Sequence, residues 1–142
     1  KTFDSRADGF ARGEGLGSVL LRKGSEKGDE DLVNLTGVAI NHDGRAATIT
    51  APNGTAQQRV LRTALAERQT MGEDVTCIEC HGTGTALGDP IEVGALRAVY
   101  GKGRSETQPL ILAATKSNIG HLEGSAGVAG ISKIILGITK AQ

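Results

Sequence analysis

Two histidines and one lysine are the residues of this sequence best suited to chemistry at a small site. His81 follows an apolar run and precedes two Gly-Thr pairs, and His121 closes the segment that begins at Lys116. Imidazole N–H groups can donate hydrogen bonds to a developing oxyanion. A lysine directly after a buried strand needs a carboxylate partner or a function, and Glu79 and Glu123 are the candidate partners. For these two histidines and this lysine, spacing alone favours a structural role and a chemical role about equally.

The cysteine pair is a weaker signal. Cys77 and Cys80 form a C-x-x-C, but on a strand side chains three positions apart face opposite sides, and the sequence has no second pair. We therefore expect two packed, reduced cysteines and no metal site. Gly13-Glu-Gly15 lacks the preceding strand and following helix of a dinucleotide loop, which favours a tight turn. His42, beside Asp43-Gly44, is interpreted as a turn residue.

To lie at one site, the two histidines must be positioned by strands that end just before them. Residues 75–80 and 110–114 predict two such strands, and because strands alternate with helices we expect an α/β fold with a parallel sheet. Ligands of open α/β sheets bind at the carboxyl ends of the strands, where His81 and the 116–121 loop fall. The final segment, residues 125–140, is apolar nearly all round and predicts a buried helix.

Two further helices are expected around these strands. Thr55 is predicted to cap a helix that ends at Gly72. Asp89 is predicted to cap a helix that ends at Gly101, with Pro90 in the first position and Glu92 bonding back to the cap.

The first third of the chain predicts a hairpin. Residues 16–21 and 32–40 are interpreted as strands, joined by a charged exposed loop over 23–31. Residues 41–54 are expected to be irregular.

Composition excludes several functions and hints at an incomplete core. The 142 residues carry 16 Lys and Arg against 16 Asp and Glu, which argues against nucleic acid or a membrane surface as the main partner. No apolar run approaches the roughly 18 residues of a membrane span, and no signal segment opens the chain, so we expect a cytoplasmic protein. The 21 glycines and the absence of Trp indicate closely packed backbones and a piece of a larger core.

Four segments of the sequence, each with its own motif, resemble one family. Residues 79–93 and 116–130 are similar to the two histidine blocks of β-ketoacyl synthases, most of all the ketosynthase domains of type I polyketide synthases. Two more blocks, residues 3–15 and residues 41–44 with 51–54, follow the family's order. Stand-alone fatty-acid enzymes of the family often carry a glutamate where Gly130 stands.

The resemblance implies a fold and a reaction. The fold would be thiolase-like, with α-β-α-β-α layers, usually dimeric. The reaction would be decarboxylative Claisen condensation, in which an acyl group on a cysteine is extended by a malonyl-type unit on acyl carrier protein. No cofactor would bind directly, because phosphopantetheine of the carrier protein holds the substrates.

The resemblance also implies residue roles. The catalytic residues would be His81 and His121, which stabilise the enolate oxygen, and Lys116, which sets the electrostatics. The substrate-binding residues would be Thr83, Thr85 and Asn118. Asp89 and Glu92 would be structural, and the resemblance implies no metal ligand.

One departure from the family limits these expectations. The nucleophilic cysteine of the family lies upstream of the Phe3 block, and neither that turn nor the later Gly-rich block is matched here. We therefore interpret residues 1–142 as part of a ketosynthase domain that works with the rest of the synthase polypeptide, is inactive alone and leaves apolar surface exposed. The alternatives are a non-catalytic module that binds acyl groups or carrier protein, and a dimerisation module.

Overall fold

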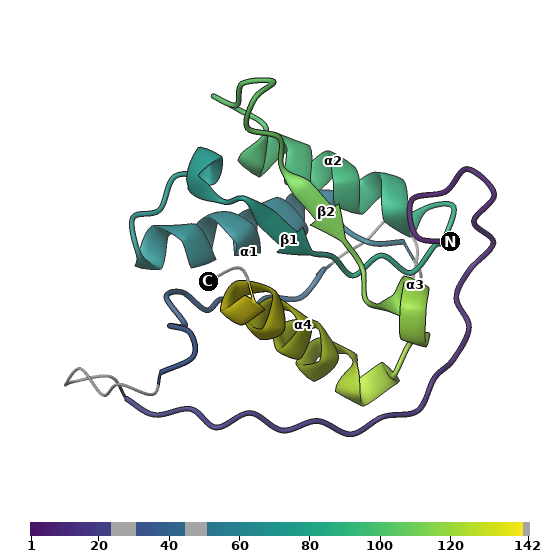
Figure 1. Cartoon of the computed structure of the whole chain (residues 1–142). Coiled ribbons are helices and arrows are strands. Elements are labelled where there is room, and N and C mark those ends of the chain that lie inside the picture. The colour runs from purple at the N-terminus through teal and green to yellow at the C-terminus, as the bar shows by residue number, and fades with distance from the viewer. Residues whose placement is uncertain (24–30, 45–50, 141–142) are drawn as a thin grey trace.

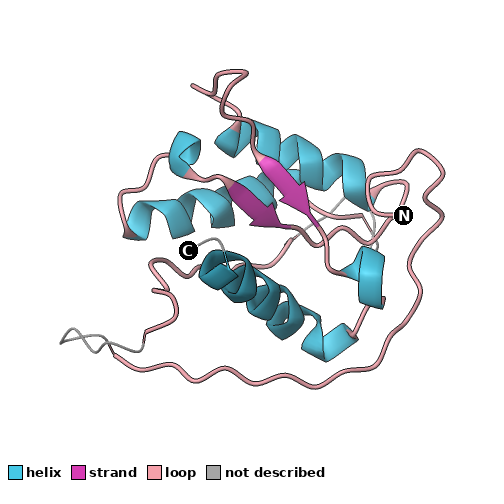
Figure 2. Cartoon of the chain, viewed as in Figure 1, coloured by secondary structure: helices cyan, strands magenta, loops and turns pink. Residues whose placement is uncertain are grey.

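A two-stranded parallel sheet lies at the centre of the computed structural model, which describes residues 1–23, 31–44 and 51–140 (Figure 1). Its strands are β1 (Cys77–Glu79) and β2 (Ile111–Ala113), paired in register from Cys77 with Ile111 to Glu79 with Ala113. The helices are α1 (Gly54–Glu67), α2 (Gly88–Tyr100), α3 (Lys116–Ile119) and α4 (Ala126–Lys140), with 3-10 turns η1 (Gly72–Asp74) and η2 (Glu123–Ser125) (Figure 2). The predicted α/β class and the parallel pairing are confirmed.

Alternation along β1 assigns each face of the sheet to different helices. Ile78 and Cys80 point toward α1 and α2, where Cys80, Leu96 and Tyr100 form the buried cluster. Glu79 points to the opposite face and contacts α4. Cys77 is exposed whereas Cys80 is buried, and both thiols are free, so the prediction that they face opposite sides is confirmed.

Both predicted helix N-caps are wrong by two residues. Asn53, not Thr55, caps α1, because its side-chain oxygen accepts the N–H groups of Thr55 and Ala56 at 3.1 Å each. That helix ends at Glu67, and Gly72 begins η1 instead. The α2 helix begins at Gly88, before Asp89, whose carboxylate makes its bonds outside the helix.

The predicted hairpin is also wrong. Residues 16–21 and 32–40 are extended but belong to no ladder, and Leu16 and Leu20 are 98% and 97% exposed. A strand needs a partner strand and a covered face, and these segments instead contact helices. The Val38 N–H donates to Glu67 Oε2 of α1 at 2.7 Å, and Gly17 lies against Val128 of α4. Most of the predicted charged loop, and residues 45–50, lie outside the described residues.

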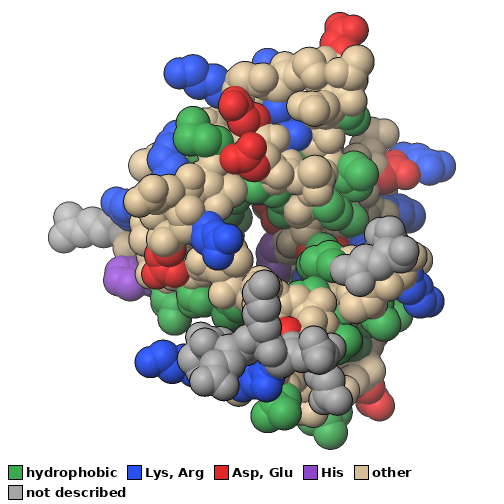
Figure 3. Space-filling model, turned by 60° about the vertical axis from the view of Figure 1, so that its left-hand side comes forward, with side chains coloured by type: hydrophobic (Ala, Val, Ile, Leu, Met, Phe, Trp, Pro, Cys, Tyr) green, Lys and Arg blue, Asp and Glu red, His purple; other side chains and the backbone are tan. Residues whose placement is uncertain are grey.

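The helix α4 is not buried as predicted. Only its Gly130 is buried, while Ile131, Leu136 and Ile138 are each about half exposed. One side of this helix packs on the sheet, and the described residues offer no second layer for the other side. The expectation of exposed apolar surface is thereby confirmed, and Figure 3 shows hydrophobic side chains reaching the surface among charged ones. None of the helices in the described residues combines the length and the apolar character needed to cross a membrane.

Candidate functional site

The loop after β1 is held in place by two carboxylates of α2. Glu92 accepts the backbone N–H groups of His81 and Gly82 at 2.6 and 2.8 Å through its two side-chain oxygens. Asp89 Oδ1 accepts the N–H of Gly84 at 2.9 Å. The expectation that Asp89 and Glu92 are structural is thus met by a different route, because they bind the loop backbone directly and do not cap the helix.

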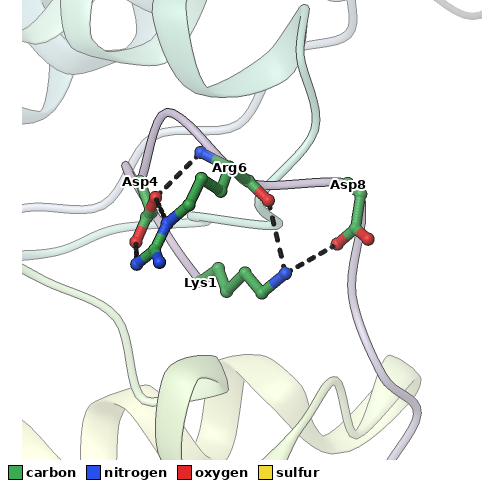
Figure 4. Close-up of polar contacts among 4 residues, drawn as sticks. All are labelled: Lys1, Asp4, Arg6 and Asp8. Carbon is green, nitrogen blue, oxygen red and sulfur yellow. Dashed lines mark hydrogen bonds and ion pairs between the residues drawn. The ribbon is translucent and has the colours of Figure 1, made fainter.

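The N-terminal segment covers this loop from the other side. Thr2 donates its hydroxyl to the carbonyl of Gly82 at 2.6 Å, and the N–H of Phe3 donates to Asp89 Oδ2 at 2.8 Å. Asp89 therefore joins the segment to the loop with one oxygen for each. The turn that presents Thr2 and Phe3 is closed by surface contacts in which Arg6 pairs with Asp4 and Lys1 with Asp8 (Figure 4).

The loop glycines serve this backbone packing. Gly82 and Gly84 have φ of +50° and +69°, a region that other residues rarely adopt. A Cβ on Gly82 would meet the methyl groups of Thr2 and Ala114 at 2.5 and 2.7 Å, and one on Gly84 would meet the carbonyl of Gly9 at 2.8 Å. Protein atoms therefore fill the Cβ side of both glycines.

The segment after β2 brings the second histidine to the same end of the sheet. The predicted loop over 116–121 contains one helical turn, α3, which ends at Gly120 with φ of +75°. The backbone of His121 then pairs with the N-terminal segment. Its N–H donates to the carbonyl of Ala11 at 2.8 Å, and its carbonyl accepts the N–H of Gly13 at 3.1 Å. One strand-like segment therefore covers both loops.

His81 and His121 lie side by side. Their ring centroids are 5.8 Å apart and the rings meet edge to face, with Phe10 packed on His121 at 4.8 Å. The Nδ1 atom of His121 accepts the N–H of Glu123 at 2.9 Å, so a neutral ring carries its hydrogen on Nε2 and can donate it to a ligand. The predicted approach of the two histidines is what the structure shows.

The electrostatic surroundings favour the neutral form of His81. Its pKa is lowered from the usual value of 6.5 chiefly by burial and next by the charge of Lys116. His121 acts in the same direction, whereas Glu92 and Asp89 oppose it.

Lys116 is not paired as predicted. Glu79 pairs with Lys133 at 2.7 Å, and Glu123 pairs with Arg12 at 3.3 Å. Among the described residues no ion pair includes Lys116, which is half-buried at the start of α3. Both expected carboxylates are engaged elsewhere, and the charge of Lys116 contributes to the lowered pKa of His81.

The three residues assigned to substrate binding differ in accessibility. Thr83 is only 8% exposed, and its hydroxyl lies 3.4 Å from that of Thr85. Thr85 Oγ1 also accepts the N–H of Gly88 at 3.1 Å, which anchors the loop to α2. Asn118 is exposed on α3.

Neither cysteine is placed to act as a nucleophile with these histidines. Burial raises the pKa of the Cys80 thiol to about 12, so it stays protonated and unreactive. Cys77 begins β1, four residues or about 13 Å of extended chain before His81. No group of metal-binding side chains occurs among the residues that the structure describes.

Sequence reasoning missed one part of the site and one cavity outside it. It did not assign Phe10, or the 9–13 segment, to the cover over the histidines, because such contacts lie far apart in the sequence. A separate cavity of about 410 Å³ opens between Leu16 and α4 and is lined by Leu122, Lys133 and Leu136 among others. It contains none of the proposed site residues.

Comparison with known proteins identifies relatives along the chain. Residues 32–142 match the family model described as "Beta-ketoacyl synthase, C-terminal domain". The chain is 49% identical over 138 residues to the pikromycin polyketide synthase component PikAII of Streptomyces venezuelae, which covers 95% of this chain and 4% of that protein. It is 47% identical over 144 residues to the erythronolide synthase EryA3 of Saccharopolyspora erythraea, covering 99% of this chain and 4% of that protein.

Solved structures agree with the sequence relatives. An oxazolomycin ketosynthase domain of Streptomyces albus superimposes with a TM-score of 0.70 at 40% identity, covering 75% of this chain and 28% of that one. The ketosynthase from module 6 of the bacillaene synthase of Bacillus subtilis gives 0.66 at 38% identity, covering 72% and 18%. The chain thus spans a small part of each relative. It has part of a thiolase-like α/β fold and belongs to the β-ketoacyl synthase family, as a portion of a ketosynthase of the polyketide synthase type.

Proposed function

We propose that this chain supplies the enolate-stabilising half of a ketosynthase active site. The observation that carries the proposal is the edge-to-face pair of His81 and His121 at the carboxyl ends of adjacent parallel strands, 5.8 Å between centroids. His121 has a fixed Nε2–H donor, and His81 is held neutral, so each ring can donate one hydrogen bond to the same oxygen. Two imidazole donors suit an oxyanion that forms only during reaction.

The chemistry begins with a malonyl-type thioester whose carbonyl oxygen lies between the two imidazoles. The bond between the α-carbon and the carboxylate breaks, carbon dioxide leaves, and the electron pair moves to the thioester oxygen as an enolate. The α-carbon then attacks an acyl thioester on a cysteine and displaces its thiolate, which makes the β-ketoacyl product. Since Cys80 stays protonated and Cys77 is remote, that cysteine belongs to another part of the synthase.

The proposed partners follow from this reaction. Acyl carrier protein would present the thioester on its phosphopantetheine arm, along Thr83, Thr85 and Asn118. The charge of Lys116 would keep His81 neutral. The rest of the synthase polypeptide would cover α4, and the complete domain would act as a homodimer. No resident cofactor is required, and the chain alone would not condense acyl groups.

Malonyl decarboxylation by the complete ketosynthase domain tests the proposal. His121→Ala and His81→Ala are each expected to lower kcat by about 10²- to 10³-fold, the cost of one oxyanion donor. His42→Ala is the matched control, because His42 is exposed and, among the described residues, its side chain bonds only the N–H of Gly44. Decarboxylation that is unchanged in both active-site variants would contradict the proposal and favour a binding module.

A further inference from the structure

The carboxylate of Glu79 joins three parts of the structure. Its side chain is 11% exposed, at the end of β1 on the face toward α4. One oxygen accepts the backbone N–H of Thr115, and the other accepts from Lys133 Nζ of α4 at 2.7 Å. Both oxygens therefore have a donor, which is the condition under which a nearly buried carboxylate is stable.

Each of these contacts leads to a site residue. Glu79 stands two positions before His81, and Thr115 stands directly before Lys116. Lys116 opens α3, the single turn that carries the chain to His121. Beyond the β1–β2 ladder, this one side chain therefore ties together the two loops that supply the histidines and the lysine.

The geometry points to Glu79 as a positioning residue: by holding Thr115, it sets Lys116 against His81 and α3 against β1. This inference rests on the proposed function. Glu79 touches neither histidine ring in the described contacts, so it acts through the backbone of the 115–121 segment and takes no part in proton transfer.

The charge state of Glu79 agrees with this role. Burial raises the pKa of its carboxyl, but hydrogen bonds from Lys133 and Thr115 outweigh burial, so the pKa lies below the usual value. The carboxylate is therefore ionised at neutral pH. Lys116 in turn lowers the pKa of His81, an effect that depends on the distance between the two groups.

Gly130 makes room for this carboxylate. A Cβ at Gly130 would lie 3.0 Å from Cγ of Glu79, tighter than nine in ten real contacts of this kind, so that the Glu79 side chain must shift by a few tenths of an ångström. Gly127, one turn earlier on α4, meets nothing within 4 Å. The two positions therefore give a matched pair of variants, one that displaces Glu79 and one that does not.

The test is the pH profile of malonyl decarboxylation by the complete ketosynthase domain. Glu79→Ala is expected to move the acid limb to higher pH, because His81 regains a pKa closer to 6.5 when Lys116 shifts away. The value of kcat is expected to fall by up to about 10²-fold, the effect of a misplacement of about 1 Å, with KM changed less. Glu79→Gln keeps one acceptor for Thr115 and is expected to restore part of the profile.

Gly130→Ala extends the test to a variant that retains the carboxylate. It is expected to move the acid limb in the same direction, and Gly127→Ala to leave it unmoved. An acid limb that stays at the wild-type pH in Gly130→Ala overturns the inference, even where Glu79→Ala does not fold. An equal shift in Gly127→Ala also overturns it, since the effect would then belong to α4 in general.

Failure of this inference differs from failure of the proposed function. If His121→Ala decarboxylates malonyl thioester as wild type does, the proposed function fails. If the histidine variants lose activity but the profiles of the Glu79 and Gly130 variants stay unmoved, only the positioning role fails.

Discussion

Glu92→Gln isolates the role of the α2 carboxylate that holds the first histidine loop. In the native chain the two oxygens of Glu92 accept the backbone N–H groups of His81 and Gly82, at 2.6 and 2.8 Å. A glutamine of the same shape keeps one acceptor, and its amide group turns a donor toward the second N–H. The loop therefore loses one charge-assisted bond without a change in side-chain volume.

The size of the effect follows from that single bond. A hydrogen bond to a charged group contributes about 1.5–3 kcal/mol. At about 1.4 kcal/mol for each factor of ten, the loss corresponds to an increase of about 10- to 150-fold in local opening.

Amide hydrogen exchange of the complete ketosynthase domain measures this opening where it occurs. The amides of His81 and Gly82 are expected to lose about 10- to 150-fold of their protection in Glu92→Gln, while amides of α2 change little. Glu106→Gln is the control, because Glu106 is exposed and no hydrogen bond to it occurs among the described residues. Equal protection of both loop amides in wild type and Glu92→Gln would refute the reasoning.

Three further predictions concern stability and reactivity. Gly127→Ala is expected to raise the free energy of unfolding by up to about 1 kcal/mol, and Gly130→Ala to give no such gain because of Glu79; denaturant midpoints compare them. Iodoacetamide is expected to label Cys77 and spare Cys80, whose thiol pKa is about 12, in peptide mass spectra of the folded protein; labelling of Cys80 at the same rate would contradict its burial. The pKa of His81 lies below 6.5 in the folded chain, so the unfolded chain binds more protons. The free energy of unfolding is therefore expected to fall as pH drops through 6.5 and to level off below the folded pKa. This pH dependence is expected to weaken in His81→Asn, and an unchanged dependence in that variant would assign it to other groups.

The elements around the site could be predicted because their signals are local. The apolar runs that form β1 and β2, the helical spacing of α1 and α2, and the glycines after each histidine all lie within a few residues of the structure they specify. The predicted ends of the helices are less accurate than their existence. Asn53 competes with Thr55 as a cap, and Asp89 satisfies the loop and the N-terminal segment in preference to its own helix.

The errors share a physical cause, which is dependence on distant partners. Residues 16–21 and 32–40 have the composition of strands, but a strand is defined by the neighbour that completes its ladder. The burial of α4 likewise depends on a layer that the described residues do not contain. The pairing of Glu79 with Lys133 joins residues 54 positions apart, and no local pattern favours it over Lys116.

The cover formed by the N-terminal segment has a consequence for biosynthesis. Thr2 bonds to Gly82 and Phe3 to Asp89, partners that are 80 and 86 residues later in the chain. At a translation rate of about 5–20 residues per second, the segment leaves the ribosome roughly 4 to 17 s before those partners are made. During that interval the Thr2 hydroxyl and the Phe3 N–H lack the hydrogen-bond acceptors that they have in the fold. The cover over the histidine loops is therefore among the last parts of this region to form during synthesis.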